Sequence, residues 1–373
     1  MIPQTNPKAA YLAQRDAIDA AIRRVLDSGW YIQGEEVAAF EREFAAWAGR
    51  AHAVAVASGT DALIVALRGL GIGPGDAVIT VSHTAVATVA AIELAGAAPV
   101  LADIDECWTL DPVALEALLA AWPAGVPQPK AVIPVHIYGQ PAAMPELQAI
   151  ADRHGLAVLE DNSQAHGARL DGRMVGSWGR ASAYSLYPTK NLGAIGDGGI
   201  IATDDAALAE TMRAIREYGW RQRYVSDIPG MNSRLDPLQA AILRVKLGRL
   251  DEDVALRQAV AGRYMAGLAG LGGLRLPAIR AGAGPVWHQY VLDAGPRRDS
   301  LQAALRDAGI GTLVHYPVPV HLQPAYRGRI ATGPGGLPRT EQAAGAVLSL
   351  PMFPQLTDDE IGTVVAEVRK AWG

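Results

Sequence analysis

Short apolar runs alternate with amphipathic segments over the first two thirds of the chain. The runs are continuously apolar, a pattern typical of strands that helices cover on both faces. They span residues 53–57, 77–81, 99–104, 130–135, 156–160, 181–186 and 198–203. Strands and helices in this rhythm predict an α/β fold with a mostly parallel central sheet flanked by helices.

Helical spacing of apolar residues predicts what lies between and beyond these strands. We expect helices over residues 61–70, 85–94, 144–154 and 206–218, followed by one long helix over 236–271. A stretch rich in Gly and Pro, 272–285, then precedes strands at 287–292 and 311–316 and helices at 301–308 and 357–372. This pattern predicts a large domain over residues 1–250 and a smaller α+β domain over 251–373.

The composition excludes several classes of protein. Of the 373 residues, 50% are hydrophobic and 19% are charged, which suits a folded chain with a sizeable core. A net charge of -5 gives no electrostatic reason to expect binding to nucleic acid or to an anionic membrane. Residues 1–15 lack the apolar core of a signal peptide, and no uncharged apolar stretch is long enough to span a bilayer. The single cysteine, Cys107, excludes an intramolecular disulfide framework and fits a cytoplasmic protein.

Lys190 is the strongest candidate for a catalytic residue. It lies in a nearly uncharged segment, 185–198, that is rich in Gly. Lysine forms Schiff bases, and burial lowers its pKa toward the neutral, nucleophilic form. Asp161 follows the strand predicted at 156–160, and ligands of parallel sheets gather beyond the carboxyl ends of the strands. An acid and a lysine at that edge suit pyridoxal phosphate (PLP), which needs a Schiff-base lysine and an anionic partner for its pyridinium nitrogen.

A phosphate group needs hydrogen-bond donors, and the sequence offers two places for it. Gly59 and Thr60 follow Ser58 at a predicted helix start, where free backbone N–H groups and the helix dipole favour an anion. A plain helix N-cap is the alternative interpretation of this tripeptide. Ser185 is the second candidate, unless it is an ordinary strand serine. Gln164 is placed to reach the cofactor ring or to hold Asp161, and a surface glutamine is the alternative.

Several ordered motifs together resemble one family, the DegT-like sugar aminotransferases, which are PLP enzymes of the aspartate aminotransferase fold. The resemblance covers almost the whole chain. Its motifs are the segments 29–34, 58–63, 135–141, 160–168, 185–199, 230–241, 321–326 and 348–354.

The resemblance implies a role for each matching residue. Lys190 is similar to the Schiff-base lysine and proton shuttle of the family, and Asp161 to the partner of the pyridine nitrogen. Gln164 is similar to that partner's neighbour. Gly59, Thr60 and Ser185 match the phosphate ligands. Asn232 matches a residue that reaches the phosphate of the neighbouring subunit's cofactor, which implies a homodimer with shared active sites.

One segment departs from the family pattern. The family usually places an aromatic ring over the cofactor, and that position here is Ala85. His83 lies two residues away and shares its side in extended backbone. Either His83 supplies the stacking surface or that face of the cofactor is more open.

The resemblance also implies the substrates, L-glutamate as amino donor and a nucleotide-linked ketosugar as acceptor. Segments 216–226 and 232–236 resemble the branch that aminates C3 of dTDP-3-keto-6-deoxyhexoses, with 4-keto sugars as the alternative. O-antigen, glycan and antibiotic sugars all stay open as products of the pathway. No histidine or acid spacing suggests a metal. The candidate substrate-binding residues are Tyr187, Arg221, Arg223, Tyr224, Arg234, His315, Tyr316 and His321.

Two other classes of protein could share parts of this pattern. A nicotinamide dehydrogenase would share the α/β pattern, but no G-x-G-x-x-G opens a helix after the first strand. A non-catalytic regulator with the aminotransferase fold is the second alternative. The intact set of lysine, aspartate and glycine argues against it.

Replacing the proposed Schiff-base lysine tests the assignment directly. We expect Lys190→Ala to abolish turnover while part of the PLP binding remains, because the phosphate and ring contacts do not involve this amine. Amine transfer and bound PLP would be measured on the same preparation. Turnover near that of the parent enzyme would contradict the role of Lys190.

Overall fold

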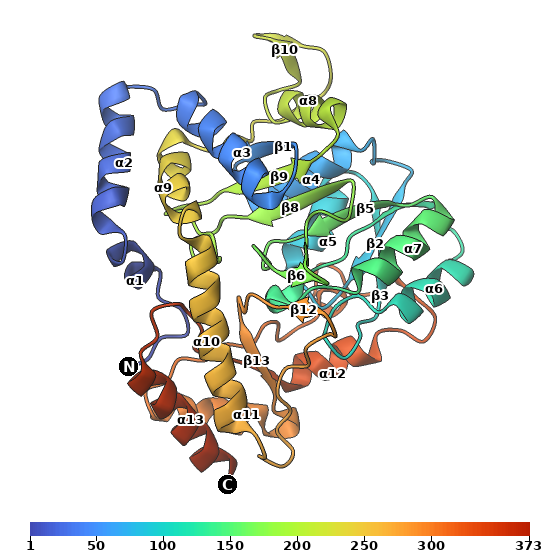
Figure 1. Cartoon of the computed structure of the whole chain (residues 1–373). Coiled ribbons are helices and arrows are strands. Elements are labelled where there is room, and N and C mark those ends of the chain that lie inside the picture. The colour runs from blue at the N-terminus through green and yellow to red at the C-terminus, as the bar shows by residue number, and fades with distance from the viewer.

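An eight-stranded sheet forms the centre of the structure, a computed structural model that describes residues 1–373 (Figure 1). The strand order is β1-β9-β8-β5-β4-β2-β3-β14, and all neighbours pair in parallel except those of β9. This arrangement confirms the predicted α/β class. The strands are β1 (His52–Val56), β2 (Ala77–Val81), β3 (Ala98–Ala102), β4 (Pro129–Val132), β5 (Ala157–Asp161), β8 (Ala181–Ser185), β9 (Gly199–Thr203) and β14 (Ala331–Thr332).

Helices cover both faces of the sheet, as the continuous apolar runs require. Along β1, Val54 and Val56 join one buried cluster with α4 and α8, whereas Ala53 and Ala55 face a second cluster with α3 and α9. Side chains of successive strand residues point to opposite faces, so one strand feeds both cores. The helices around the sheet are α1 (Pro7–Leu12), α2 (Arg15–Ser28), α3 (Glu35–Ala48), α4 (Gly59–Gly69), α5 (Val86–Leu94), α6 (Pro112–Ala120), α7 (Met144–His154), α8 (Ala206–Ile215) and α9 (Pro237–Leu247).

The single long helix predicted over 236–271 is wrong, because two helices share that range. α9 ends at Leu247 and α10 (Leu250–Leu268) begins three residues later. Gly248 has a low helix propensity, and Arg249 leaves the helical region with φ -116° and ψ 2°. Leu247 and Leu250 are both buried, so the apolar pattern runs through the break and hides it from the sequence.

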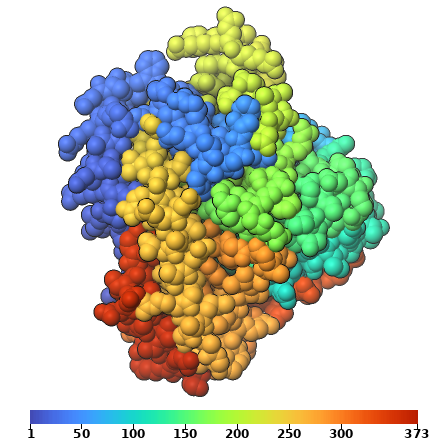
Figure 2. Space-filling view, in the orientation of Figure 1, coloured from blue at the N-terminus to red at the C-terminus, as the bar shows by residue number.

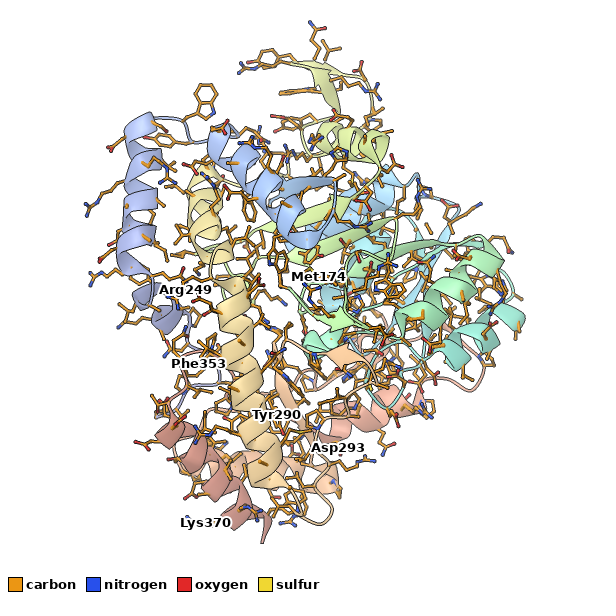
Figure 3. All side chains as sticks on the ribbon, viewed as in Figure 1. Met174, Arg249, Tyr290, Asp293, Phe353 and Lys370 are labelled. Carbon is orange, nitrogen blue, oxygen red and sulfur yellow. The ribbon has the colours of Figure 1, made fainter.

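A separate core lies in the C-terminal part of the chain, between α10 and a two-stranded sheet. The Tyr290 ring on β13 packs against Tyr264 of α10, with ring centroids 5.0 Å apart (Figure 3). The predicted strand over 311–316 is absent apart from one bridge between Leu313 and Ser349. The elements here are β13 (Tyr290–Asp293), α11 (Arg298–Asp307), α12 (Pro338–Ala346), β15 (Val347–Leu350) and α13 (Asp358–Trp372), with short 3-10 helices η2 (Gly295–Arg297) and η3 (Val320–Leu322).

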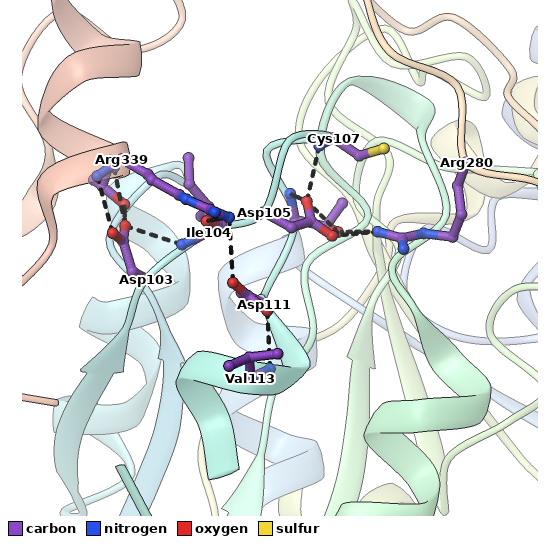
Figure 4. A network of polar contacts seen from close by, with 10 residues as sticks. Asp103, Ile104, Asp105, Cys107, Asp111, Val113, Arg280 and Arg339 are labelled. Carbon is purple, nitrogen blue, oxygen red and sulfur yellow. Dashed lines mark hydrogen bonds and ion pairs between the residues drawn. The ribbon is translucent and has the colours of Figure 1, made fainter. Parts of the chain in front are cut away.

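The division into domains at residue 250 stays a prediction, since the two parts are joined at several points. β14, from the C-terminal part, pairs with β3 and extends the large sheet. A polar network follows the same joint (Figure 4). Asp103 accepts hydrogen bonds from the backbone N–H groups of Arg339 and Thr340, and Asp105 pairs with Arg280. The C-terminal part is therefore fixed to the loop that follows β3.

A hairpin of β10 (Trp220–Gln222) and β11 (Val225–Ser226) projects from the molecule beyond α8 (Figures 1 and 2). Its residues 221–226 are all exposed. The remaining short elements are β6 (Arg169–Leu170), β7 (Arg173–Met174), β12 (Ala283–Gly284) and η1 (Ile137–Gly139). None of the helices has the length and apolar character needed to cross a membrane.

Glu160, the penultimate residue of β5, anchors the turn at 176–179 to the sheet. Its carboxylate accepts hydrogen bonds from the backbone N–H groups of Gly176, Trp178 and Gly179 at 2.6–2.8 Å. His136 accepts from Ala142 N at Nδ1, so its proton is on Nε2, 3.2 Å from Glu160 Oε2. Burial alone would raise the pKa of the Glu160 carboxyl, but His136 and these N–H donors outweigh it and lower the pKa.

Glu160→Gln is expected to destabilise the protein by about 2–4 kcal/mol at neutral pH, because an amide would leave buried donors unsatisfied. A lowered folded-state pKa contributes stability above the ordinary value of 4.5, and this contribution is lost as the pH falls through the folded pKa. The free energies of unfolding of the parent protein and of Glu160→Gln should therefore become equal at acid pH. Denaturant unfolding from pH 7 downward measures this, with exposed Glu146→Gln as the control. A difference in the free energy of unfolding that stays the same at all pH values would contradict the charged state of Glu160.

Candidate active site

A cavity of about 240 Å³ opens at the carboxyl edge of the parallel strands. Lys190 lines it from the loop between β8 and β9, and Asp161 lines it from the end of β5. The start of α4 closes a third side with Gly59 and Thr60. Parallel strands end at one edge, which is why residues so distant in sequence meet here.

Lys190 stands in an environment that favours the neutral amine. Burial lowers the pKa of Lys190 to about 8, and the nearby charge of Asp161 acts in the opposite direction. The loop that carries it is closed by a hydrogen bond from Leu186 N to Gly198 O at 2.8 Å. The backbone N–H of Lys190 donates to Tyr187 O at 2.8 Å. The amine is therefore presented by a short, internally bonded turn.

The α4 start is built for a close approach between chain segments. Ser58 is the N-cap, and its hydroxyl accepts from Asp61 N at 3.1 Å. A Cβ on Gly59 would stand 2.5 Å from Ser185 Cβ, and a Cβ on Gly199 would stand 2.1 Å from Ser58 O. Only glycine fits at both positions. The structure thus brings the predicted phosphate ligands Gly59, Thr60 and Ser185 to one wall of the cavity.

Asp161 is oriented by two hydrogen bonds. Its Oδ1 accepts from Ser163 N at 3.1 Å, and its Oδ2 accepts from the Thr88 hydroxyl at 2.9 Å. Because Thr88 gives its proton to Asp161, the Thr84 hydroxyl 2.9 Å away donates to Thr88. This chain of hydroxyls fixes the carboxylate toward the cavity. Neither Thr84 nor Thr88 was among the predicted site residues, although their spacing of four residues at a helix start was a usable signal.

Gln164 is held in one orientation by groups from two parts of the chain. Its Oε1 accepts from Tyr138 N at 2.6 Å, and its Nε2 donates to the Tyr316 hydroxyl at 3.1 Å. Tyr138 has a positive φ of 60°, a strained backbone state for a non-glycine residue. It was missed as a site residue, since nothing in the sequence marks that conformation.

His83 does not line the cavity, whereas Ala85 does. The Nε2 atom of His83 lies 2.7 Å from the Tyr138 hydroxyl, and that hydroxyl donates to the carbonyl of His315. A carbonyl only accepts, so His83 carries its proton on Nε2. Burial lowers the pKa of His83 to about 4, and this ring is neutral at physiological pH. The buried hydrogen bond to Tyr138 therefore holds the His83 ring outside the lining of the cavity.

Some of the candidate substrate residues lie at the cavity or beside it, and the others lie elsewhere in the chain. Tyr187 lines the cavity, and the Tyr316 hydroxyl accepts a hydrogen bond from the lining residue Gln164. His315 is bonded through Nδ1 to Ser349 Oγ at 2.8 Å, and burial with the charge of Lys190 lowers its pKa to about 4.

Other candidates lie away from this cavity within the single chain. His321 is bonded to Ser82 through Nδ1 at 2.8 Å. Arg234 pairs with Glu217 at 3.7 Å. Asn232 and the hairpin residues Arg221, Arg223 and Tyr224 are exposed, and none of them lines the cavity.

The residues present fit PLP. The cavity combines a lysine of lowered pKa, a hydrogen-bonded carboxylate, and a glycine-containing helix start with a hydroxyl on each side. These are the groups that a Schiff base, a pyridinium nitrogen and a phosphate each require. No group of three or more His, Cys, Asp or Glu side chains is placed to hold a metal ion.

Comparisons with known proteins show what the whole chain is similar to. The DegT/DnrJ/EryC1/StrS aminotransferase family matches residues 13–369. A dTDP-3-amino-3,4,6-trideoxy-alpha-D-glucose transaminase of Streptomyces venezuelae is 49% identical over 99% of this chain and 96% of its own. The crystal structure of S. venezuelae DesV with a ketimine intermediate matches with a TM-score of 0.94 at 49% identity, covering 100% and 98% of the two chains. NtdA from Bacillus subtilis, solved with its cofactor PMP, matches with a TM-score of 0.88 at 30% identity over 96% and 82%.

Removing one hydroxyl tests the orientation of Asp161. We expect Thr88→Val to weaken PLP affinity about 10- to 100-fold, because valine keeps the shape but loses the hydrogen bond to a charged group. Titration of the apoprotein with PLP measures this. Thr363→Val is the control, since that exposed hydroxyl donates only to Asp359 O. Equal PLP affinity in the Thr88→Val variant and the parent would contradict the assignment.

Proposed function

Since the chain belongs to the DegT/DnrJ/EryC1/StrS aminotransferase family, we propose that it transfers an amino group from L-glutamate to C3 of a nucleotide-linked 3-keto-6-deoxyhexose. The nucleotide we favour is dTDP. The observation that carries the proposal is the meeting of Lys190, Asp161 and the α4 start in one cavity. The S. venezuelae transaminase, with its 3-amino sugar, supports C3 over the 4-keto alternative.

Each residue of the cavity has a defined task in this reaction. When bound, PLP supplies an electrophilic carbon and a ring that spreads the carbanion charge. Asp161 would hold the ring nitrogen protonated, and the α4 start would bind the phosphate. Lys190 Nζ is the group that would take the proton from Cα of the donor and give it to the aldehyde carbon that the cofactor supplies. An amine with a pKa near 8 is suited to both directions of this transfer.

The face of the cavity near Ala85 is proposed to stay open rather than stacked. Ala85 and Thr84 line that wall, and His83 is committed to Tyr138. We assign the space beside Ala85 to the sugar ring. Tyr187, which lines the cavity, and Tyr316, which is hydrogen-bonded to the lining residue Gln164, would contact its hydroxyl groups.

A homodimer is proposed, because several candidate residues point away from the cavity of their own chain. Tyr224 is 73% exposed and Asn232 is also exposed. Trp30, 65% exposed, lies with Tyr31 and Ile32 on the loop after α2. Large apolar side chains in solvent mark interaction surfaces. In a dimer, Asn232 would reach the partner's phosphate, and Arg221, Arg223 and Tyr224 would reach its sugar nucleotide.

We propose L-glutamate as the amino donor because the chain belongs to this aminotransferase family. A cytoplasmic location is proposed on the single, buried cysteine. We also propose that Arg234, His315 and His321 contribute to the acceptor site.

A single turnover tests the function and the position of the new amine. The protein would be loaded in its pyridoxamine phosphate form and mixed separately with dTDP-linked 3-keto and 4-keto 6-deoxyhexoses. We expect the absorption of the PLP form to return within one turnover for the 3-keto sugar alone. Return of this absorption with the 4-keto sugar alone would show that the enzyme places the amine on C4 instead of C3. A protein that also fails to react with glutamate would be a non-catalytic regulator.

A further inference from the structure

A second, smaller cavity lies behind the loop that carries Lys190. It has a volume of about 40 Å³ and lies at the elbow between α9 and α10. Loop residues 188–191, N-terminal residues 5–7 and residues 353–355 surround it. Phe353 is seen beside α10 in Figure 3. The charged side chains in its wall are Lys190, Lys246, Asp253 and Arg257.

Arg257 is a buried cation that forms no direct ion pair, although the charge of Asp253 acts on it from a distance. The residue is only 6% exposed. Nη1 donates to the carbonyls of Trp287 and Met352, both at 3.2 Å, while Nε is buried without an acceptor. Burial lowers the pKa of Arg257 to about 10, still far above neutrality. Asp253 opposes this shift without a direct contact, so the buried charge is compensated only in part, and an anion beside it would lower the cost of burial.

Lys246 supplies a second cation on the same wall. Its Nζ donates to Gly193 O at 2.6 Å, and two further N–H groups remain available. Burial lowers its pKa to about 8, so at neutral pH most molecules carry the charge. The one acid in the wall, Asp253, forms a direct ion pair with neither cation, although its charge raises the pKa of both. Burial raises the pKa of Asp253 itself. The two positive charges therefore exceed the negative charge around this cavity.

Amide groups complete the lining. Gln14 Oε1, Gln355 Oε1 and Asn191 Oδ1 are all buried without a partner. A 180° flip of either glutamine amide exchanges the positions of Oε1 and Nε2, so an N–H donor replaces the oxygen without a change in the shape of the side chain. Asn191 cannot turn, because its Nδ2 donates to Val286 O at 3.1 Å. The glutamines can thus add neutral donors to the two cations.

We propose that this cavity binds one small monovalent anion, such as chloride, between Arg257 and Lys246. The volume equals roughly three water-sized probes, which suits a halide and excludes a nucleotide. The anion satisfies Arg257 Nε and a free N–H of Lys246. Because Lys246 also holds Gly193, the bound anion ties the loop of Lys190 to α9 and α10. The site is independent of the proposed sugar acceptor.

Bromide replaces chloride and can be located by anomalous diffraction. Crystals of the holoenzyme grown in sodium bromide should show one anomalous peak within hydrogen-bond distance of Arg257 Nε and Lys246 Nζ. The peak should vanish in Lys246→Gln. A cavity that contains only water, or an acidic side chain from a partner subunit, would overturn the proposal.

A solution measurement keeps the proposal testable if crystals of the variant fail. Thermal unfolding would be followed against sodium bromide, with sodium gluconate holding the ionic strength constant. We expect a saturable rise in Tm of about 2 °C at ten times the half-saturating concentration. Lys246→Gln should lose the rise, while Arg263→Gln, an exposed arginine on α10 that pairs with Asp358, should keep it. An equal rise in all three proteins would refute a specific site.

Discussion

The burial of an amine beside a carboxylate is the constraint on which the rest of the site depends. Lys190 loses solvation in the cavity, and the charge of Asp161 partly restores the protonated form. The balance holds only while Asp161 stays fixed, and that requires the hydroxyls of Thr84 and Thr88 at the start of α5. The sheet contributes by ending β5 and β8 at the same edge, so the two charges meet without a long loop.

Much of this arrangement could be predicted from the sequence. Continuous apolar runs identified the strands, since strands covered on both faces have no polar side to alternate with. The rule that ligands gather at the carboxyl edge then placed Gly59, Asp161 and Lys190 in one cavity, and the structure brings them together. Helices α1 to α3 were not predicted, although resemblance motifs fall within this region.

What the sequence could not supply depends on contacts between distant segments. The break at Gly248 is invisible because the apolar pattern continues across it. Tyr138 is defined by partners from four segments, among them Gln164, His83 and the carbonyl of His315. No local pattern encodes such a meeting point. Extended-strand geometry left open whether His83 or an open face lies over the cofactor, and the buried hydrogen bond between His83 and Tyr138 is a contact that this geometry could not predict.

The shortest strand of the sheet has a consequence for the behaviour of the whole protein in solution. β14 contributes only Ala331 and Thr332, but it covers the outer edge of β3. An uncovered edge presents unpaired N–H and C=O groups to which a strand of another molecule can add. The C-terminal part therefore shields the central sheet from edge-to-edge aggregation, and a chain shortened before residue 331 would lose that protection together with its small core.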